Sequence, residues 1–418
     1  MRPRPTPLAD SRVPPMDPTV PRAETADWLA VPQSQRPRLL EAAQRCGRHL
    51  SEGSFDLDGM GTGLFAGSSG IDLFRARLAA ATGETTDAAR RIDSLLTRLE
   101  GRPEELATVG LTGWGGVTYA AAHVAAVCGD SALGRRAAAW APAVTERLGD
   151  DIGCELVDGV AGMVLGLLAL HQVEPCPRVL ATAVRGGELI LWHAQPIGDG
   201  LGWPLVLHGD WGRAFAGLAQ GGAGVVLALV RLWQATGDPR FQTSARAAMA
   251  YERTLFPPED CPWRTRRERR LRRLALEVGS SVGVSAWWHG AAGIGLTRLA
   301  LPEDLLGPGG SSDLRMALRS TADLPSDGGP GLAHGVLGRL ELQARARAQG
   351  VTDIGGQGLE TQLEGVLDAL DAELQKDAGC GGMEPGLWTG LAGVGYGLLR
   401  LTDPAGIPSV MTLDRPLV

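Results

Sequence analysis

The feature that most limits how this chain can fold is a glycine motif, G-x-x-G, followed each time by an apolar run. The motif occurs seven times, and its starts lie 46, 46, 62, 69, 45 and 55 residues apart. The copies are GSSG (67–70), GWGG (113–116), GVAG (159–162), GGAG (221–224), GAAG (290–293), GVLG (335–338) and GLAG (390–393). Repetition at this period is typical of folds that stack one supersecondary unit many times.

Each repeat reads as two helices. The runs after the motif, such as IDLFRARLAAATG and VVLALVRLWQATG, have the length and pattern of buried or amphipathic helices. More polar helical segments, such as ETTDAARRIDSLLTRL and DPRFQTSARAAMAYERTLF, lie between them. Because no alternating β-branched runs compete, we predict an all-α chain built from an inner and an outer helix per repeat.

The glycines suggest how the repeats meet. There are 59 of them in 418 residues, about twice the usual share of ~7%. We expect a positive φ and the lack of a Cβ to let each loop pack closely at a helix N-terminus. Such N-termini carry free N–H groups and the positive end of the helix dipole.

Seven hairpins can close into a ring or stay open. The uneven spacing favours a single closed (α/α)7 toroid of seven helical hairpins with insertions, and an open solenoid is the alternative. We place the toroid at residues 25–418. Residues 1–24 are rich in proline and lack apolar periodicity, so we expect a disordered lead.

Bulk properties exclude several classes of protein. A net charge of −7 argues against electrostatic binding of nucleic acid by the whole molecule. No signal peptide opens the chain, and no apolar run is long enough to span a bilayer. The six cysteines are scattered without a C-x-x-C pair. We therefore expect a cytoplasmic protein with reduced thiols and no membrane association.

The ordered motifs resemble those of the lanthionine synthetase cyclase (LanC-like) family, most closely the C-terminal cyclase domain of class II lanthipeptide synthetases. The resemblance runs from about Leu64 to the C-terminus. Its motifs are GLFAGSSGIDLF (63–74), ELVDGVAGM (155–163), GLAQGGAGVVLALVRLWQATGD (217–238), AYER (250–253), AWWHGAAGIGLTRLAL (286–301), GLAHGVLGRLEL (331–342), PGLWTGLAGVGYGLLRL (385–401) and PSV (408–410).

The resemblance implies an activity. Enzymes of this family close thioether rings by adding a peptide cysteine to a dehydroalanine or dehydrobutyrine of the same peptide. A zinc ion held by two cysteines and a histidine lowers the pKa of the thiol. A further histidine and an aspartate near the metal handle protons. Zinc-free members also occur, among them the cyclase-like domains of class III synthetases, and some of these still support ring formation.

This chain departs from the family's zinc motif. Trp288 stands where the first zinc cysteine is expected, and Ala333 stands at the second, so that only His334 remains of the three ligands. Gln220 occupies the place of the proton-handling histidine, and Glu155 that of the aspartate. We therefore predict no metal and no cofactor.

Three residues are candidates for acid–base work in a metal-free addition. His334 and His289 lie at neighbouring loops, and an unperturbed histidine pKa near ~6.5 suits proton transfer. The alternative for both is a polar group bonded to loop carbonyls. Glu155 is either a second acid–base group or a carboxylate at a helix N-terminus. Its neighbour Cys154 is either a reactive thiol or a buried cysteine.

Other residues are candidates for substrate binding, with core packing or a structural role as the alternative. They combine apolar surface with hydrogen-bonding groups near the end of the ring where we expect the seven loops to meet. They are Trp287, Trp288, Gln220, His208, Asp210 and Trp211.

The stretch RTRRERRLRR (264–273) holds seven arginines. It is either a solvated helix face or a basic patch for an acidic leader peptide or partner enzyme. We take Arg266, Arg267, Arg269 and Arg270 as its candidate contacts.

Two classes of function follow. The first is a zinc-independent cyclase or related tailoring enzyme acting on a dehydrated ribosomal peptide, with addition of an amine in place of a thiol as a variant. The second is a non-catalytic scaffold that binds the precursor peptide or a dehydratase or kinase-like partner. Because the chain starts at a methionine, we expect a protein without a fused dehydratase.

Overall fold

The computed structural model describes residues 31–53, 55–57, 59–106, 108–149, 152–204, 214–255, 287–288, 290–322, 329–351, 358–375 and 383–418. Across these ranges nearly all of the regular secondary structure is helical, as the apolar periodicity predicts. The proline-rich residues 1–24 lie outside the described residues.

Seven inner helices follow the seven motifs. Each begins one residue after the first motif glycine, which serves as the N-cap. They are α2 (Ser68–Thr82), α4 (Trp114–Cys128), α6 (Val160–Val173), α8 (Gly222–Thr236), α11 (Ala291–Leu299), α13 (Val336–Ala348) and α15 (Leu391–Thr402).

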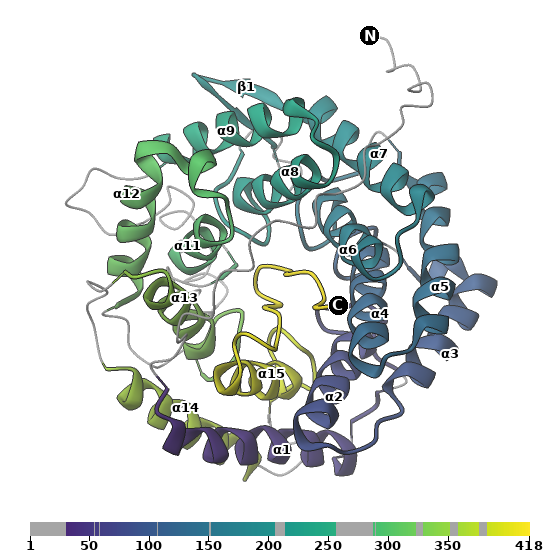
Figure 1. The fold of residues 1–418 in the computed structure, drawn as a ribbon, viewed down its shortest axis with the longest axis vertical. Coiled ribbons are helices and arrows are strands. Elements are labelled where there is room, and N and C mark those ends of the chain that lie inside the picture. The colour runs from purple at the N-terminus through teal and green to yellow at the C-terminus, as the bar shows by residue number, and fades with distance from the viewer. Residues whose placement is uncertain are drawn as a thin grey trace, which may run out of the picture.

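Outer helices pack against the inner ones and complete the wall of a ring (Figure 1). They are α1 (Arg36–Glu52), α3 (Ala88–Gly101), α5 (Ser131–Trp140), α7 (Pro177–His193), α9 (Pro239–Thr254), α12 (Glu303–Ala322) and α14 (Leu359–Leu374). In six repeats the outer helix follows its inner helix. The seventh pair joins α15 to α1, so the two ends of the chain close the ring.

A circuit of backbone hydrogen bonds links the seven loops in order. The N···O distances are 2.8–3.3 Å. The bonds run from amide to carbonyl as follows: Leu64 to Leu111, Leu111 to Leu156, Leu156 to Ala219, Ala219 to Trp288, Trp287 to Ala333, Ala333 to Trp388, and Trp388 to Phe65. Because the last bond returns to the first loop, the fold is a closed toroid and the open solenoid is excluded.

The motif glycines are required for close approach and not for positive φ. The first glycine of each motif has a negative φ, for example −106° at Gly67 and −120° at Gly390. In six motifs a Cβ at the second glycine would overlap the carbonyl oxygen of the residue six positions earlier, as at Gly162 with Leu156. At Gly116 the overlap is with Leu111, five positions earlier. The expectation of a left-handed backbone at these loops is therefore wrong, and steric crowding is the reason for glycine.

Short elements decorate the ring. Short 3-10 helices lie at Gln33–Gln35, Pro103–Glu105 and Ala141–Arg147. A small antiparallel hairpin, β1 (Gln195–Ile197) and β2 (Gly200–Gly202), links α7 to the segment before α8, and the sequence analysis did not predict it. Helix α12 is kinked at Gly307, where φ is 59°.

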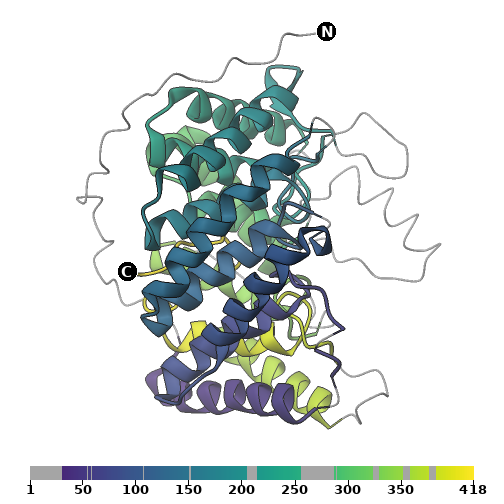
Figure 2. The ribbon, with the colours of Figure 1, turned by 90° about the vertical axis from the view of Figure 1, so that its right-hand side faces the viewer.

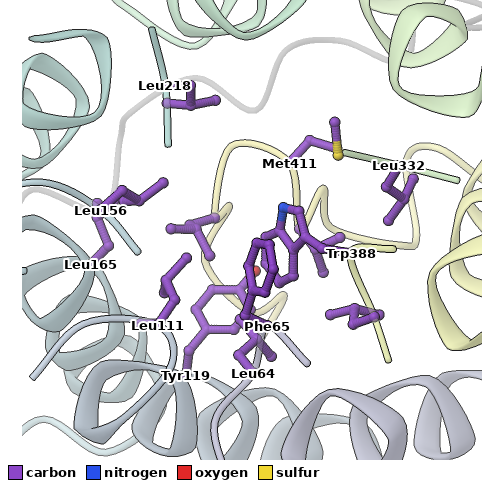
Figure 3. Packing of buried hydrophobic residues seen from close by; sticks show 14 of the residues in the cluster. Leu64, Phe65, Leu111, Tyr119, Leu156, Leu165, Leu218, Leu332, Trp388 and Met411 are labelled. Carbon is purple, nitrogen blue, oxygen red and sulfur yellow. The ribbon is translucent and has the colours of Figure 1, made fainter. Parts of the chain in front are cut away.

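The C-terminal segment, residues 403–418, returns into the middle of the ring (Figure 1). Its apolar side chains Val410, Met411 and Leu413 are buried. Figure 3 shows the leucines of the loops, among them Leu111 and Leu332, arranged around the ring centre, where Phe65 stacks on Trp388. Viewed from the side, the helices cross the wall obliquely and the C-terminus emerges at one edge of the ring (Figure 2).

Asp414 anchors this segment. Its backbone carbonyl accepts hydrogen bonds from Tyr119 Oη (2.9 Å) and His123 Nε2 (3.0 Å) on α4. Its carboxylate lies 3.4 Å from both Arg231 on α8 and Arg345 on α13. These arginines hold the pKa of Asp414 at about 2 in spite of its burial.

Candidate functional site

The side chains at the loop face of the toroid follow a simple alternation. We call the residue immediately before each first motif glycine a rim residue. The rim residues are Ala66, Thr112, Asp158, Gln220, His289, His334 and Thr389. Those that the structure describes are exposed or half-buried, whereas the residue before each of them is buried, apart from the half-buried Trp288. In each described repeat the turn or bend before the motif therefore directs the rim side chain toward solvent and the preceding side chain toward the core.

Four aromatic residues from three loops meet beneath the rim, and we call them the aromatic cluster: Phe65, Trp287, Trp288 and Trp388. The Phe65 ring packs edge-on against Trp288, with 5.0 Å between ring centroids, and stacks on Trp388 at 5.3 Å. Trp287 lies 5.3 Å from Trp388 and donates its indole N–H to the carbonyl of Met411, 2.7 Å away. The cluster thus joins loops one, five and seven to the C-terminal segment.

Trp288 contacts two rim residues at once. Its indole ring stacks on the imidazole of His334 with 5.6 Å between centroids and 14° between planes. Its indole N–H donates to Oε1 of Gln220 over 3.2 Å. Three residues that the sequence singled out are therefore brought together, on loops four, five and six. Trp287, by contrast, is 1% exposed and packs in the core, away from any peptide at the rim.

His334 is exposed to solvent, yet desolvation lowers the pKa of its imidazole below the usual value. The exposure and the desolvation are compatible, because water reaches one side of the imidazole while the Trp288 indole covers the other face. A lowered pKa leaves the imidazole neutral at pH 7, which is the form that accepts a proton. His334 is thus available as a base at the rim.

Glu155 lies in the third loop and is 7% exposed. Its carboxylate accepts hydrogen bonds from the backbone amides of Val157, Asp158 (2.7 Å) and Gly159. Burial nevertheless raises the pKa of this carboxyl to about 7. The structure therefore gives Glu155 a loop-holding role together with a pKa close to neutrality, where a proton can be gained or lost.

Two neighbours of Glu155 differ in what they offer. Burial raises the pKa of Cys154 to about 12, so its thiol stays protonated and is a poor nucleophile. Asp158 is an exposed carboxylate at the rim that accepts a hydrogen bond from the hydroxyl of Thr112. Sequence reasoning missed Asp158 and Thr112, although their position before a motif glycine is the signal that they share with Gln220 and His334.

Comparison with known proteins identifies the family. Residues 58–412 match the family described as lanthionine synthetase C-like protein. The chain belongs to this family. A solved nisin cyclase has the same fold, with a TM-score of 0.51, 13% sequence identity, and coverage of 89% of this chain and 95% of that one. An unsaturated glucuronyl hydrolase from Bacillus sp. GL1 aligns with a TM-score of 0.42 and 15% identity over 90% of this chain and 98% of that one. No curated protein matches the sequence.

The zinc ion that the lanthionine synthetase C-like family implies does not fit the residues present here. At the two cysteine positions, the indole nitrogen of Trp288 is a hydrogen-bond donor that is already bound to Gln220, and Ala333 has no ligand atom. His334 would be a lone ligand against the four that zinc usually takes. Within the described residues, no three His, Cys, Asp or Glu side chains gather as a metal site.

Several predicted site residues lie outside the described residues. They are His289, His208, Asp210, Trp211, Arg266, Arg267, Arg269 and Arg270. Among the helices that the structure does describe, none combines the length and apolarity needed to cross a membrane.

Proposed function

We propose that this protein is a zinc-independent cyclase of the lanthionine synthetase C-like family, which closes rings in a dehydrated, ribosomally made peptide by Michael-type addition. The observation that supports it most is the contact of Trp288 with both Gln220 and His334, because an imidazole with a lowered pKa is suited to accept a proton. A cytoplasmic setting and a dehydratase or kinase-like partner belong to the same proposal.

The chemistry assigned to these residues is balanced without a metal. His334 takes the proton from a peptide thiol, and the thiolate sulfur forms a bond to Cβ of the dehydroamino acid. The π electrons of the C=C bond move into the adjacent carbonyl and give an enolate. The imidazolium then returns its proton to Cα. Because desolvation lowers the pKa of His334, the imidazolium gives the proton up readily in this last step. His289 is the candidate for a second acid–base group, and Glu155 remains one because of its pKa of about 7.

The test is ring closure in a dehydrated precursor peptide. Free thiols are counted by alkylation and mass spectrometry after incubation with the protein, and compared with incubation alone. We expect faster loss of thiols with the protein. A protein that binds the precursor or a partner enzyme but closes no rings above the uncatalysed background is the scaffold of the second hypothesis.

Purified protein should contain no stoichiometric zinc. The reason is the donor set, one histidine in place of two cysteines and a histidine. Elemental analysis after chelator-free purification checks this. One tightly bound zinc per chain would contradict the proposal, because it would require ligands outside the family's positions.

The arginine-rich stretch should bind an acidic leader peptide or partner. Changing Arg266, Arg267, Arg269 and Arg270 to glutamate should weaken binding, and the loss should shrink at high salt because exposed charges are screened. Titration of a labelled leader at low and high salt measures this, with circular dichroism to check the fold. Equal affinity at low salt would indicate that the stretch is only a solvated helix face.

A further inference from the structure

We infer that Gln220 is a catalytic hydrogen-bond donor that stabilises the enolate oxygen, and that Trp288 is the residue that fixes its orientation. The inference rests on the proposed function and assigns a role to a residue that cannot transfer protons. It depends on one hydrogen bond and on what that bond leaves free.

The contact between Trp288 and Gln220 determines which way the amide points. An indole N–H donates and cannot accept, so the atom that faces it 3.2 Å away must be the amide oxygen of Gln220. The amide nitrogen lies on the other branch of the same planar group and so is directed away from the indole. Among the residues that the structure describes, none accepts a hydrogen bond from this nitrogen. Gln220 therefore presents an N–H donor at the half-buried rim.

The proposed reaction needs a hydrogen-bond donor at the carbonyl oxygen that becomes the enolate oxygen. Addition to a dehydroamino acid moves negative charge from the thiolate onto the carbonyl oxygen of the acceptor residue. Preorganised N–H donors at such an oxygen are among the largest single contributions to catalysis. His334 lies against the face of the indole whose N–H edge holds Gln220. One aromatic ring thus sets the base and the donor at a fixed separation across the site.

A residue that only bound the peptide would not need this orientation. Trp288 uses one of the two lone pairs of the Gln220 oxygen, whereas the amide nitrogen keeps its N–H groups for a ligand at the rim. The backbone of loop four is also fixed, because the Ala219 amide donates to the Trp288 carbonyl (3.1 Å) in the circuit of loops. Both the side-chain and the backbone contacts of loop five therefore hold Gln220 in one place.

The experiment compares ring closure by Gln220→Ala, Gln220→Glu and Trp288→Phe at a pH above 8, where an introduced glutamate is ionised. We expect Gln220→Ala to lower kcat by about 10²–10³ with little change in peptide affinity. Gln220→Glu should be slower still, because its carboxylate repels the enolate although it keeps the shape and the acceptor for Trp288. Trp288→Phe keeps a ring beside His334 but frees the amide to rotate, so we expect a smaller loss in kcat.

The order of the two Gln220 variants decides the matter. Gln220→Glu with activity equal to or above that of Gln220→Ala, or Gln220→Ala with wild-type kcat, overturns the enolate-donor role while wild-type ring closure keeps the proposed function. If the wild type itself closes no rings, the proposed function fails and this inference with it. The rate of Gln220→Ala should keep the wild-type pH profile, since glutamine does not titrate.

Discussion

Replacing His334 by alanine should lower the rate of ring closure by about 10²–10⁴, the usual loss on removing a positioned general base. At the family's zinc positions only His334 could be a ligand, so in the proposed mechanism a side chain accepts the proton of a thiol whose unperturbed pKa is ~8.5. Replacing His289 by alanine should lower the rate of ring closure by the same order, because His289 is the only other histidine immediately before a motif glycine. Peptide affinity should change little in both variants, and kcat and Kd measured separately check this.

Two controls separate a chemical from a structural role. His193→Ala removes an imidazole at the C-terminal end of the outer helix α7 and should leave kcat unchanged. His334→Gln keeps a polar, hydrogen-bonding side chain at the rim but cannot accept the proton, so it should be as slow as His334→Ala. Wild-type kcat in His334→Gln would show that any polar residue suffices there, and it would remove His334 from the mechanism.

The pH profile gives an independent sign. Desolvation lowers the pKa of His334, so the neutral base is present above a value lower than the usual ~6.5 and is lost as the pH falls through it. Wild-type kcat should therefore stay level down to below pH 6.5 and decline at more acidic pH. In His334→Ala this acidic limb should disappear.

The period of the motif was sufficient to predict the ring and its inner helices. All seven begin one residue after the first glycine of a motif, as at Gly113 and Gly221, because the loop crowds the helix N-terminus so closely that no Cβ fits. The same motif led to a wrong expectation of positive φ. A glycine motif cannot distinguish a left-handed backbone from a close approach of two backbone segments, since both favour a residue without a side chain.

The site could be predicted only in part. The place of Gln220, Trp288 and His334 at neighbouring loops followed from their position before motif glycines. The contacts among these three side chains could not be predicted in the same way, since the closed ring brings together residues that lie 46 or more positions apart in the sequence. The burial of Trp287 and the backbone hydrogen bonds to Glu155 depend on loop conformation, which side-chain type does not specify.

The role of the C-terminal segment had no signal in the periodicity. Residues 403–418 contain no apolar helical run, yet they supply the centre of the ring with Val410, Met411 and Leu413. Nothing in the sequence marks Asp414 among the other carboxylates, because its partners Arg231 and Arg345 come from separate repeats and meet it only in the closed ring. Long-range pairing of this kind is a property of the closed fold.

Asp414→Asn should be the most destabilising charge substitution in the C-terminal segment. The asparagine keeps the shape but leaves Arg231 and Arg345 facing each other in the ring, with Arg400 nearby, without the carboxylate that compensates them. Removing one partner of a fully buried ion pair usually costs about 3–5 kcal/mol, and this partly buried group should lose less than that. Urea unfolding should show a lower midpoint, while Asp199→Asn, in the exposed turn between β1 and β2, should change it little.

The pH dependence of this loss has a definite sign. The folded pKa of Asp414, about 2, lies below its ordinary value of 3.8, so the carboxylate stabilises the fold fully above about pH 4. That contribution is lost as the pH falls from about 4 toward 2. The difference between wild type and Asp414→Asn should therefore be constant from pH 5 to 8 and shrink in acid.

A double variant tests whether the cause is uncompensated charge. Arg345→Met in the Asp414→Asn background removes one of the two guanidinium groups that the substitution leaves unpaired, and methionine keeps much of the buried volume. We expect the double variant to be more stable than the sum of the single effects predicts, by about 0.5–3 kcal/mol, as is usual for residues in direct contact. Additive effects would mean that Asp414 stabilises the segment through its hydrogen bonds to Thr412 and the backbone, and not through the arginines.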